Sequence, residues 1–116
     1  ELQIYVKDFG TSKDDFSLVA EVENKIIGAV WVRIMNDYGH IDDKTPSLAI
    51  SLYKKYRGQG IGSSLIKEML SLLQTHGYKR VSLSVQKANY AAKLYQKIGF
   101  RIIKEIGNEW IMTYNL

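Results

Sequence analysis

The sequence predicts an α/β fold with a mixed central sheet of about six strands and helices on both faces. Three observations support this prediction. Apolar stretches typical of strands come early in the chain, two segments with helical spacing follow, and a hairpin-like apolar pattern closes it. A strand pattern precedes each helical segment, which indicates at least one right-handed parallel crossover in the middle of the sheet.

The first strand patterns are joined by short connections. Leu18–Val22 predicts a strand, and Glu23–Lys25 predicts a tight turn. The nearly continuous apolar run Ile26–Met35 predicts a longer strand that is buried on both faces. Within this run, Gly28 indicates a bulge or a close approach of another backbone. A polar loop over Asn36–Pro46 follows.

The middle of the chain alternates between strand and helix patterns. Ser47–Tyr53 alternates cleanly between apolar and small or polar residues, which predicts a strand. Ile61–Leu73 has apolar residues at helical spacing, and Gly77 is a natural end for that helix. Val81–Val85 is a further strand with period two.

The C-terminal part predicts a short helix and a hairpin. Asn89 is a suitable N-cap for a helix over Ala91–Ile98, which the following glycine ends. Phe100–Ile106 and Glu109–Tyr114 then form the two strands of a closing hairpin across Gly107–Asn108.

Length and composition predict one domain over residues 1–116. The absence of cysteine excludes disulfides and thiolate zinc sites, and two histidines, His40 and His76, argue against a metal centre. No apolar run approaches the about 20 residues of a membrane span, and no secretory signal is visible. We therefore expect a cytoplasmic protein without a membrane role. The net charge of +4 favours an anionic ligand but equally fits a solubility surface.

The run Tyr56–Gly62 is the most informative feature of the sequence. It places three glycines where a strand turns into a helix. Glycine allows close approach of an anion, and a helix N-terminus carries about +0.5 of a charge together with unpaired N–H donors. The run therefore predicts a diphosphate site, although by itself it has low specificity.

Two stretches of the sequence carry a family resemblance. Leu52–Gly62 resembles the acyl-CoA pyrophosphate loop of the GNAT superfamily of N-acetyltransferases, written Arg/Gln-x-x-Gly-x-Gly/Ala and matched by Arg57, Gly60 and Gly62. Further along, Asn89–Phe100 is similar to the second signature of that family, an Asn and an Ala followed by Leu-Tyr-x-x-x-Gly-Phe. Both signatures in order, with a helix and a strand between them, form a specific pair.

The resemblance covers roughly residues 18–116 and implies the acyl-CoA N-acyltransferase fold. The usual N-terminal strand and first helices are expected to be missing, with Glu1–Gly10 a remnant, so that the domain is N-terminally truncated or completed by another chain. The implied activity is transfer of the acetyl group of acetyl-CoA to a primary amine by direct attack, without a metal. The acceptor, a small-molecule or peptide amine, stays open, and edge strands near the C-terminus favour a homodimer.

Carried over residue by residue, the resemblance implies a coenzyme site built largely from main-chain atoms. Amides from Arg57 through Ser63 would face the diphosphate, with added charge from Arg57 and the neighbouring lysines. The strand before the loop would diverge from its neighbour, so that its exposed backbone pairs with the pantetheine arm. The expected cofactor-binding residues are Ile50, Leu52, Arg57, Gly58, Gln59, Gly60, Ile61, Gly62, Ser63 and Asn89.

Tyr95 matches the general acid of the family. A phenol with a pKa of about 10 stays protonated at neutral pH and can protonate a leaving thiolate whose pKa is about 8.5. The alternative is a tyrosine that only packs between helix and sheet. Asn89 matches a position that touches the coenzyme arm, and this role is compatible with helix capping. Its spacing to Tyr95 is one residue shorter than in many family members.

No general base is assigned. The strands at Ser47–Tyr53 and Val81–Val85, where several family members carry a glutamate, contain no carboxylate. The remaining candidates are Asp37, His40, Asp42, Asp43 and Glu21. The missing base favours an alternative function, a non-catalytic module that binds or senses acyl-CoA.

A basic cluster raises the further alternative of a nucleic-acid-binding domain. The cluster comprises Lys79, Arg80, Lys87, Lys93 and Lys97. No aromatic-interleaved RNA motif or recognition-helix pattern accompanies it, so we expect a solvated surface and no nucleic-acid partner.

Overall fold

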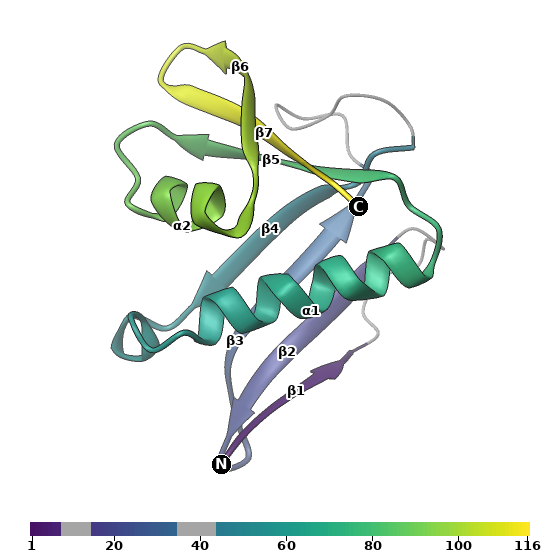
Figure 1. Cartoon of the computed structure of the whole chain (residues 1–116). Helices are drawn as coiled ribbons and strands as arrows, with labels where there is room; N and C mark the ends of the chain where they lie inside the picture. The colour runs from purple at the N-terminus through teal and green to yellow at the C-terminus, as the bar shows by residue number, and fades with distance from the viewer. Residues whose placement is uncertain (8–14, 35–43) are drawn as a thin grey trace.

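The computed structural model describes residues 1–7, 15–34 and 44–116. These residues form a seven-stranded sheet in the order β1-β2-β3-β4-β5-β7-β6, together with two α-helices (Figure 1). Only β4 and β5 are parallel neighbours, so the predicted mixed α/β class is confirmed. The elements are β1 (Leu2–Val6), β2 (Phe16–Val22), β3 (Lys25–Arg33), β4 (Ser47–Leu52), a 3-10 turn η1 (Lys54–Tyr56), α1 (Ile61–Thr75), β5 (Arg80–Gln86), α2 (Ala91–Ile98), β6 (Arg101–Ile106) and β7 (Glu109–Asn115).

The β2–β3 hairpin has the tight turn that the sequence predicts. Glu23 and Asn24 both adopt positive φ, 51° and 66°. Two successive residues of this kind produce the twist that matches a two-residue hairpin. The expected irregularity at Gly28 is also confirmed, because the pairing of β2 with β3 shifts register between Ala20 and Glu21, opposite this glycine.

The strand β1 corrects the expectation that an N-terminal strand is missing. It pairs antiparallel with β2, from Leu2 opposite Val22 to Val6 opposite Leu18. The sheet therefore has seven strands rather than about six. The sequence did not reveal β1 because a five-residue alternation next to a polar stretch is a weak strand signal until its partner is known.

Both helices lie over the same face of the sheet among the described residues (Figure 1), which corrects the expectation of helices on both faces. The reason is topological. The connections β4–α1–β5 and β5–α2–β6 both step in the same direction across the sheet. Since such crossovers follow the right-handed rule, they place their helices on one side. The buried side of α1 and the α2 residues Ala92 and Tyr95 share one hydrophobic core with the sheet. The α1 residues in it are Ile61, Leu65, Ile66, Met69, Leu70 and Leu73.

Candidate active site

A wedge-shaped opening between β4 and β5 is the central feature of the site. These parallel strands share a single residue pair, Ser47 with Ser82, and then diverge (Figure 1). At the closed end, the Ser82 N–H donates to the Pro46 carbonyl at 3.0 Å. Beyond this point β4 continues to pair only with β3, and β5 only with β7. The divergence that the family resemblance implies is therefore present in the structure.

The main chain of β4 faces this opening at alternate residues. The Tyr53 N–H donates to the Ile27 carbonyl at 3.0 Å, so the odd-numbered residues of β4 are bonded to β3. Because main-chain groups alternate along an antiparallel ladder, Ile50 and Leu52 direct their N–H and C=O groups into the opening. The Leu52 carbonyl accepts a hydrogen bond from Arg57 Nε at 3.3 Å. An open strand of this kind can pair with an extended ligand.

The loop after β4 leaves a row of unpaired amides. The Arg57 N–H donates to the Lys54 carbonyl at 3.1 Å, so this amide, which the sequence analysis included, is already used within the 3-10 turn. At the other end, the Ser64 N–H makes the first hydrogen bond of α1, to Gly60 at 3.0 Å. Between them, the N–H groups of residues 58–63 have no acceptor within the described part of the chain.

Glycine conformation keeps this row of amides accessible. Gly58 and Gly60 have φ angles of 76° and 83°, in the left-handed region that favours glycine. A methyl group added to either residue would meet no protein atom within 4 Å, so the space beside them is open. The first turn of α1 carries no acidic side chain to compete with an anion. The Gln59 amide braces the loop by donating to the Lys55 carbonyl at 3.1 Å.

Three elements of the site meet at Gly62. A methyl group added there would lie 3.8 Å from Ile50 Cδ1 on β4 and 3.9 Å from Leu94 Cδ2 on α2. The start of α1, the open strand and the helix that carries Tyr95 are therefore in van der Waals range of one point. Leu94 was not among the residues predicted for the site, although the Leu-Tyr pair of the second signature was a usable signal.

Tyr95 is a core residue with a hydroxyl that no described side chain engages. Its exposed fraction is 8%, and its ring centroid lies 6.0 Å from that of Phe100. Burial raises the pKa of the Tyr95 phenol above its ordinary value of 10.0. The group therefore keeps its proton at neutral pH, as a general acid requires.

Asn89 supplies a side-chain hydrogen bond at the start of α2, although the N-cap position itself, which the sequence analysis gave to Asn89, is occupied by Tyr90. The Asn89 side-chain oxygen accepts a hydrogen bond from the Ala91 N–H at 2.8 Å, in the Asx geometry that satisfies a first-turn donor. The side chain is exposed, so its amide nitrogen is accessible from solvent. Contact with a coenzyme arm stays a prediction for this residue.

Glu21 is the one candidate base that lies within the described residues, and it lies away from the opening. Glu21 accepts a hydrogen bond from the Tyr5 hydroxyl at 2.6 Å, and this bond raises the pKa of Tyr5. It lies on β2, which β3 separates from β4. The other four candidates, Asp37, His40, Asp42 and Asp43, lie outside the described residues.

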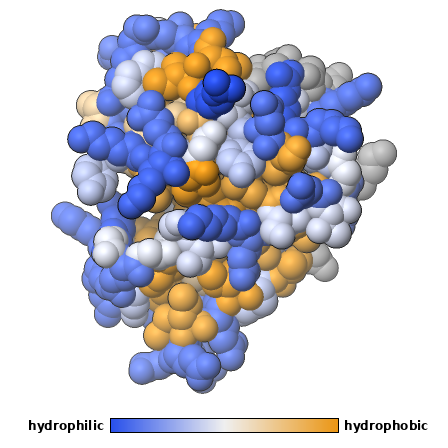
Figure 2. All heavy atoms as spheres, viewed as in Figure 1, coloured by the Kyte–Doolittle hydropathy of each residue, from blue (hydrophilic) through white to orange (hydrophobic). Residues whose placement is uncertain are grey.

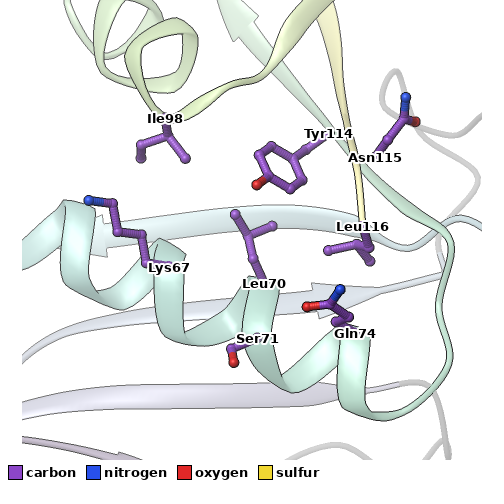
Figure 3. Close-up of a pocket in the computed structure, with 8 residues that line it drawn as sticks. All are labelled: Lys67, Leu70, Ser71, Gln74, Ile98, Tyr114, Asn115 and Leu116. Carbon is purple, nitrogen blue, oxygen red and sulfur yellow. The ribbon is translucent and has the colours of Figure 1, made fainter.

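A separate hollow of about 520 Å³ lies on the helical side of the molecule (Figure 3). It is lined by α1, the end of α2 and the end of β7, through Lys67, Leu70, Ser71, Gln74, Ile98, Tyr114, Asn115 and Leu116. No residue of β4 or of the glycine loop lines it. We therefore assign the candidate site to the main-chain opening, whose donors are backbone groups, and not to this hollow.

A sheet that opens at its one parallel pair, with a glycine loop leading into a helix at the opening, defines the acyl-CoA N-acyltransferase fold. Residues 1–100 match the family model described as "Acetyltransferase (GNAT) family". The chain belongs to this family.

Individual relatives agree with this assignment. The chain is 31% identical over 84 residues to human N-acetyltransferase 8B, an alignment that covers 72% of this chain and 37% of that protein. It is 29% identical, with a TM-score of 0.76, to the acetyltransferase of GNAT family from Streptococcus pneumoniae, covering 91% of this chain and 70% of that one. The PaiA N-acetyltransferase from Thermoplasma acidophilum, solved in complex with coenzyme A, shares the fold at 23% identity and a TM-score of 0.76, over 89% and 62% of the two chains.

The described ranges contain neither a metal-binding cluster nor a membrane-spanning helix. No three His, Cys, Asp or Glu side chains within them are grouped so that they could hold a metal ion. None of the helices in these ranges is long and apolar enough to cross a bilayer.

Substitution by alanine should affect stability differently at Gly28 and Gly62, the two glycines that touch β4. A methyl group at Gly28 would lie 2.6 Å from Leu52 Cδ1 and 3.0 Å from the Ser51 carbonyl oxygen, whereas Gly62 offers only ordinary contacts. We expect Gly28→Ala to lower the free energy of unfolding by about 1–3 kcal/mol. Gly62→Ala should leave it unchanged or raise it by up to about 1 kcal/mol, because alanine favours helix. Urea denaturation measures both, and equal stabilities would contradict the close packing of β3 on the end of β4.

Proposed function

We propose that this chain is an N-acetyltransferase that moves the acetyl group of acetyl-CoA to a primary amine by direct attack. The observation that carries the proposal is the convergence at Gly62 of the open strand, the amide row and the helix bearing Tyr95. Membership of the acetyltransferase family and the fold shared with a coenzyme A complex support it.

In the proposed complex, the diphosphate of the coenzyme binds the amides of residues 58–63. These donors lie at the positive end of α1, where an anion is favoured. The exposed side chains of Lys54, Lys55 and Arg57 add positive charge around them. The Arg57 guanidinium, now bonded to the Leu52 carbonyl, is within reach of the same region. Ile61 is buried, so it would contribute only its main chain, and the Ser63 hydroxyl is available for a phosphate oxygen.

The pantetheine arm would extend along β4 as an additional strand. Ile50 and Leu52 supply the main-chain groups that face it, and Asn89 meets the arm from the start of α2. This pairing fixes the thioester relative to the sheet, so that a β4 amide can polarise its carbonyl. Orientation and carbonyl polarisation are the two contributions that an acyl transfer needs before any proton moves.

The reaction itself follows from attack by a neutral amine. The nitrogen lone pair forms the new C–N bond at the thioester carbon, and the C–S bond breaks when the tetrahedral intermediate collapses. Tyr95 donates its phenolic proton to the departing sulfur, the proton lost from the amine passes to solvent, and Tyr95 regains a proton from solvent before the next turnover. The raised pKa of Tyr95 keeps that proton in place until it is needed.

We further propose a small-molecule or peptide amine as the acceptor and the cytoplasm as the compartment. A fold does not name a substrate, so the acceptor has to come from a screen. Turnover of acetyl-CoA against a mixed amine library, with products identified by mass spectrometry, provides that screen. No nucleic acid or membrane takes part in the proposed reaction.

One observation favours a second candidate, an acyl-CoA-binding module without catalysis. Neither β4 nor β5 carries a carboxylate, so the described walls of the opening contain no base. The two functions separate in a thiol-release assay. An acetyltransferase releases free thiol from acetyl-CoA when an acceptor amine is supplied, whereas a sensor binds acetyl-CoA and shows no turnover with any amine.

Substitution of Gly60 tests the amide row. We expect Gly60→Val to abolish coenzyme A binding, because the branched side chain would occupy the open space proposed for the phosphate. Gly77→Val is the matched control, since Gly77 has nearly the same φ, 85° against 83°, and equally open surroundings at the other end of α1. The measurement is the rise in melting temperature that coenzyme A produces, which any native-state ligand must cause above its Kd. Equal shifts in the two variants would refute the assignment.

Removal of the Tyr95 hydroxyl tests the general acid. Tyr95→Phe should slow thiol release by about 10²-fold or more while coenzyme A still binds. Tyr114→Phe is the control, because both tyrosines pack against Phe100 and both lose only a hydroxyl. Because burial raises the pKa of the Tyr95 phenol above its ordinary value, the phenol stays protonated up to about pH 10. Deprotonation of Tyr95 should therefore not lower the wild-type rate below that pH. An unchanged rate in Tyr95→Phe would remove the residue from the mechanism.

A further inference from the structure

The two edges of the sheet that the described residues form differ in how well they are protected against pairing. The edge strand β6 contains Arg101, Lys104 and Glu105, and its pairing with β7 shifts register between Ile102 and Lys104. Glu105 also forms an ion pair with Lys87. Charges and bulges on an edge strand discourage association with other chains. The C-terminal edge, where the sequence analysis expected a dimer, is therefore the protected one.

The other edge strand, β1, has none of these features. Leu2–Val6 contains no charge and no proline, and it pairs with β2 without a register shift. Three of its five side chains are exposed large hydrophobic or aromatic groups, Leu2 at 41%, Tyr5 at 36% and Val6 at 54%. Apolar atoms are also visible near the lower end of the molecule in Figure 2, where Figure 1 places the N-terminal strands. An edge of this composition favours pairing with another strand.

The direction of the main-chain hydrogen bonds of β1 determines which of its residues can pair with a further strand. The Lys7 N–H donates to the Ser17 carbonyl at 3.0 Å, so the odd-numbered residues of β1 are bonded to β2. By the alternation of an antiparallel ladder, Leu2, Ile4 and Val6 direct their N–H and C=O groups outward. A partner strand must therefore pair with these three residues.

We propose that β1 pairs antiparallel with β1 of a second copy of this chain, about a two-fold axis at Ile4. In this register Leu2 lies opposite the partner's Val6, Ile4 opposite the partner's Ile4, and Glu1 opposite the partner's Lys7. All three outward-facing residues find a partner, whereas a shift by two residues leaves one of them unpaired. The dimer continues the sheet from one protomer into the other.

The strand is self-complementary in both polarity and charge. The even-numbered side chains that face each other are aliphatic, Gln3 faces the partner's Tyr5, and the flanking residues Glu1 and Lys7 have opposite charge and meet under the two-fold axis. This complementarity is the reason to expect a second copy rather than an unrelated strand. The opening between β4 and β5 lies well inside the sheet, away from β1, so pairing leaves both candidate active sites accessible.

Matched lysine substitutions on the two edges test the proposal. Val6→Lys and Ile103→Lys each replace a β-branched side chain of similar exposure, 54% and 51%, on an edge strand. Sedimentation equilibrium of the 116-residue chain over a wide concentration range should show a monomer–dimer equilibrium. We expect Val6→Lys to weaken self-association by about tenfold or more, and Ile103→Lys to leave it unchanged. Far-ultraviolet circular dichroism spectra equal to that of the wild-type chain would show that both variants are folded, because loss of the dimer by itself lowers the melting temperature.

Hydrogen exchange tests the register. The amides of Ile4 and Val6 should become protected as the protein concentration rises, whereas Gln3 and Tyr5, already bonded to β2, should not change. The proposal is overturned if the wild-type chain is monomeric at every concentration, if Ile103→Lys rather than Val6→Lys dissociates the dimer, or if concentration-dependent protection appears on β6 instead.

Discussion

An unpaired stretch of main chain in the middle of the sheet is the constraint around which this molecule is organised. Backbone N–H and C=O groups inside a sheet normally find partners in the next strand. Here β4 and β5 share only the pair Ser47 and Ser82, so Ile50 and Leu52 present their polar groups to an opening. A sheet can retain such an opening when a ligand supplies the missing hydrogen bonds. In our proposal the pantetheine arm of the coenzyme has this role.

The crossover topology places the other parts of the site at the same opening. Right-handed connections put α1 and α2 on one face, and α1 begins at the wide end of the opening (Figure 1). Its positive terminus, the glycine amides and the start of α2 therefore converge, and a point beside Gly62 lies within van der Waals range of side chains from both β4 and α2. The fold thus combines an anion site with an open strand, which matches a ligand that has a diphosphate and an extended amide-containing arm.

Local signals in the sequence were sufficient for most of the elements. The helix over Ile61–Thr75 followed from apolar spacing, and the helix over Ala91–Ile98 followed from a cap and a terminal glycine. Features that depend on contacts between distant parts of the chain could not be predicted from such local signals. The strand Leu2–Val6 needed its partner to be recognised, and the common face of the helices depended on strand order. Within the site, the use of the Arg57 amide by a 3-10 turn depended on backbone geometry that a glycine-rich motif does not specify.

The amides of residues 58–63 form the proposed diphosphate site, on which the proposed function depends. Titration of the ¹⁵N-labelled protein with coenzyme A, followed by NMR, measures each of these amides individually. We predict the largest chemical-shift changes at Gly58, Gly60 and Gly62, with smaller changes along β4. If these amides stay unperturbed while the coenzyme binds, for example with the changes confined to the hollow around Lys67 and Tyr114, the central claim is contradicted.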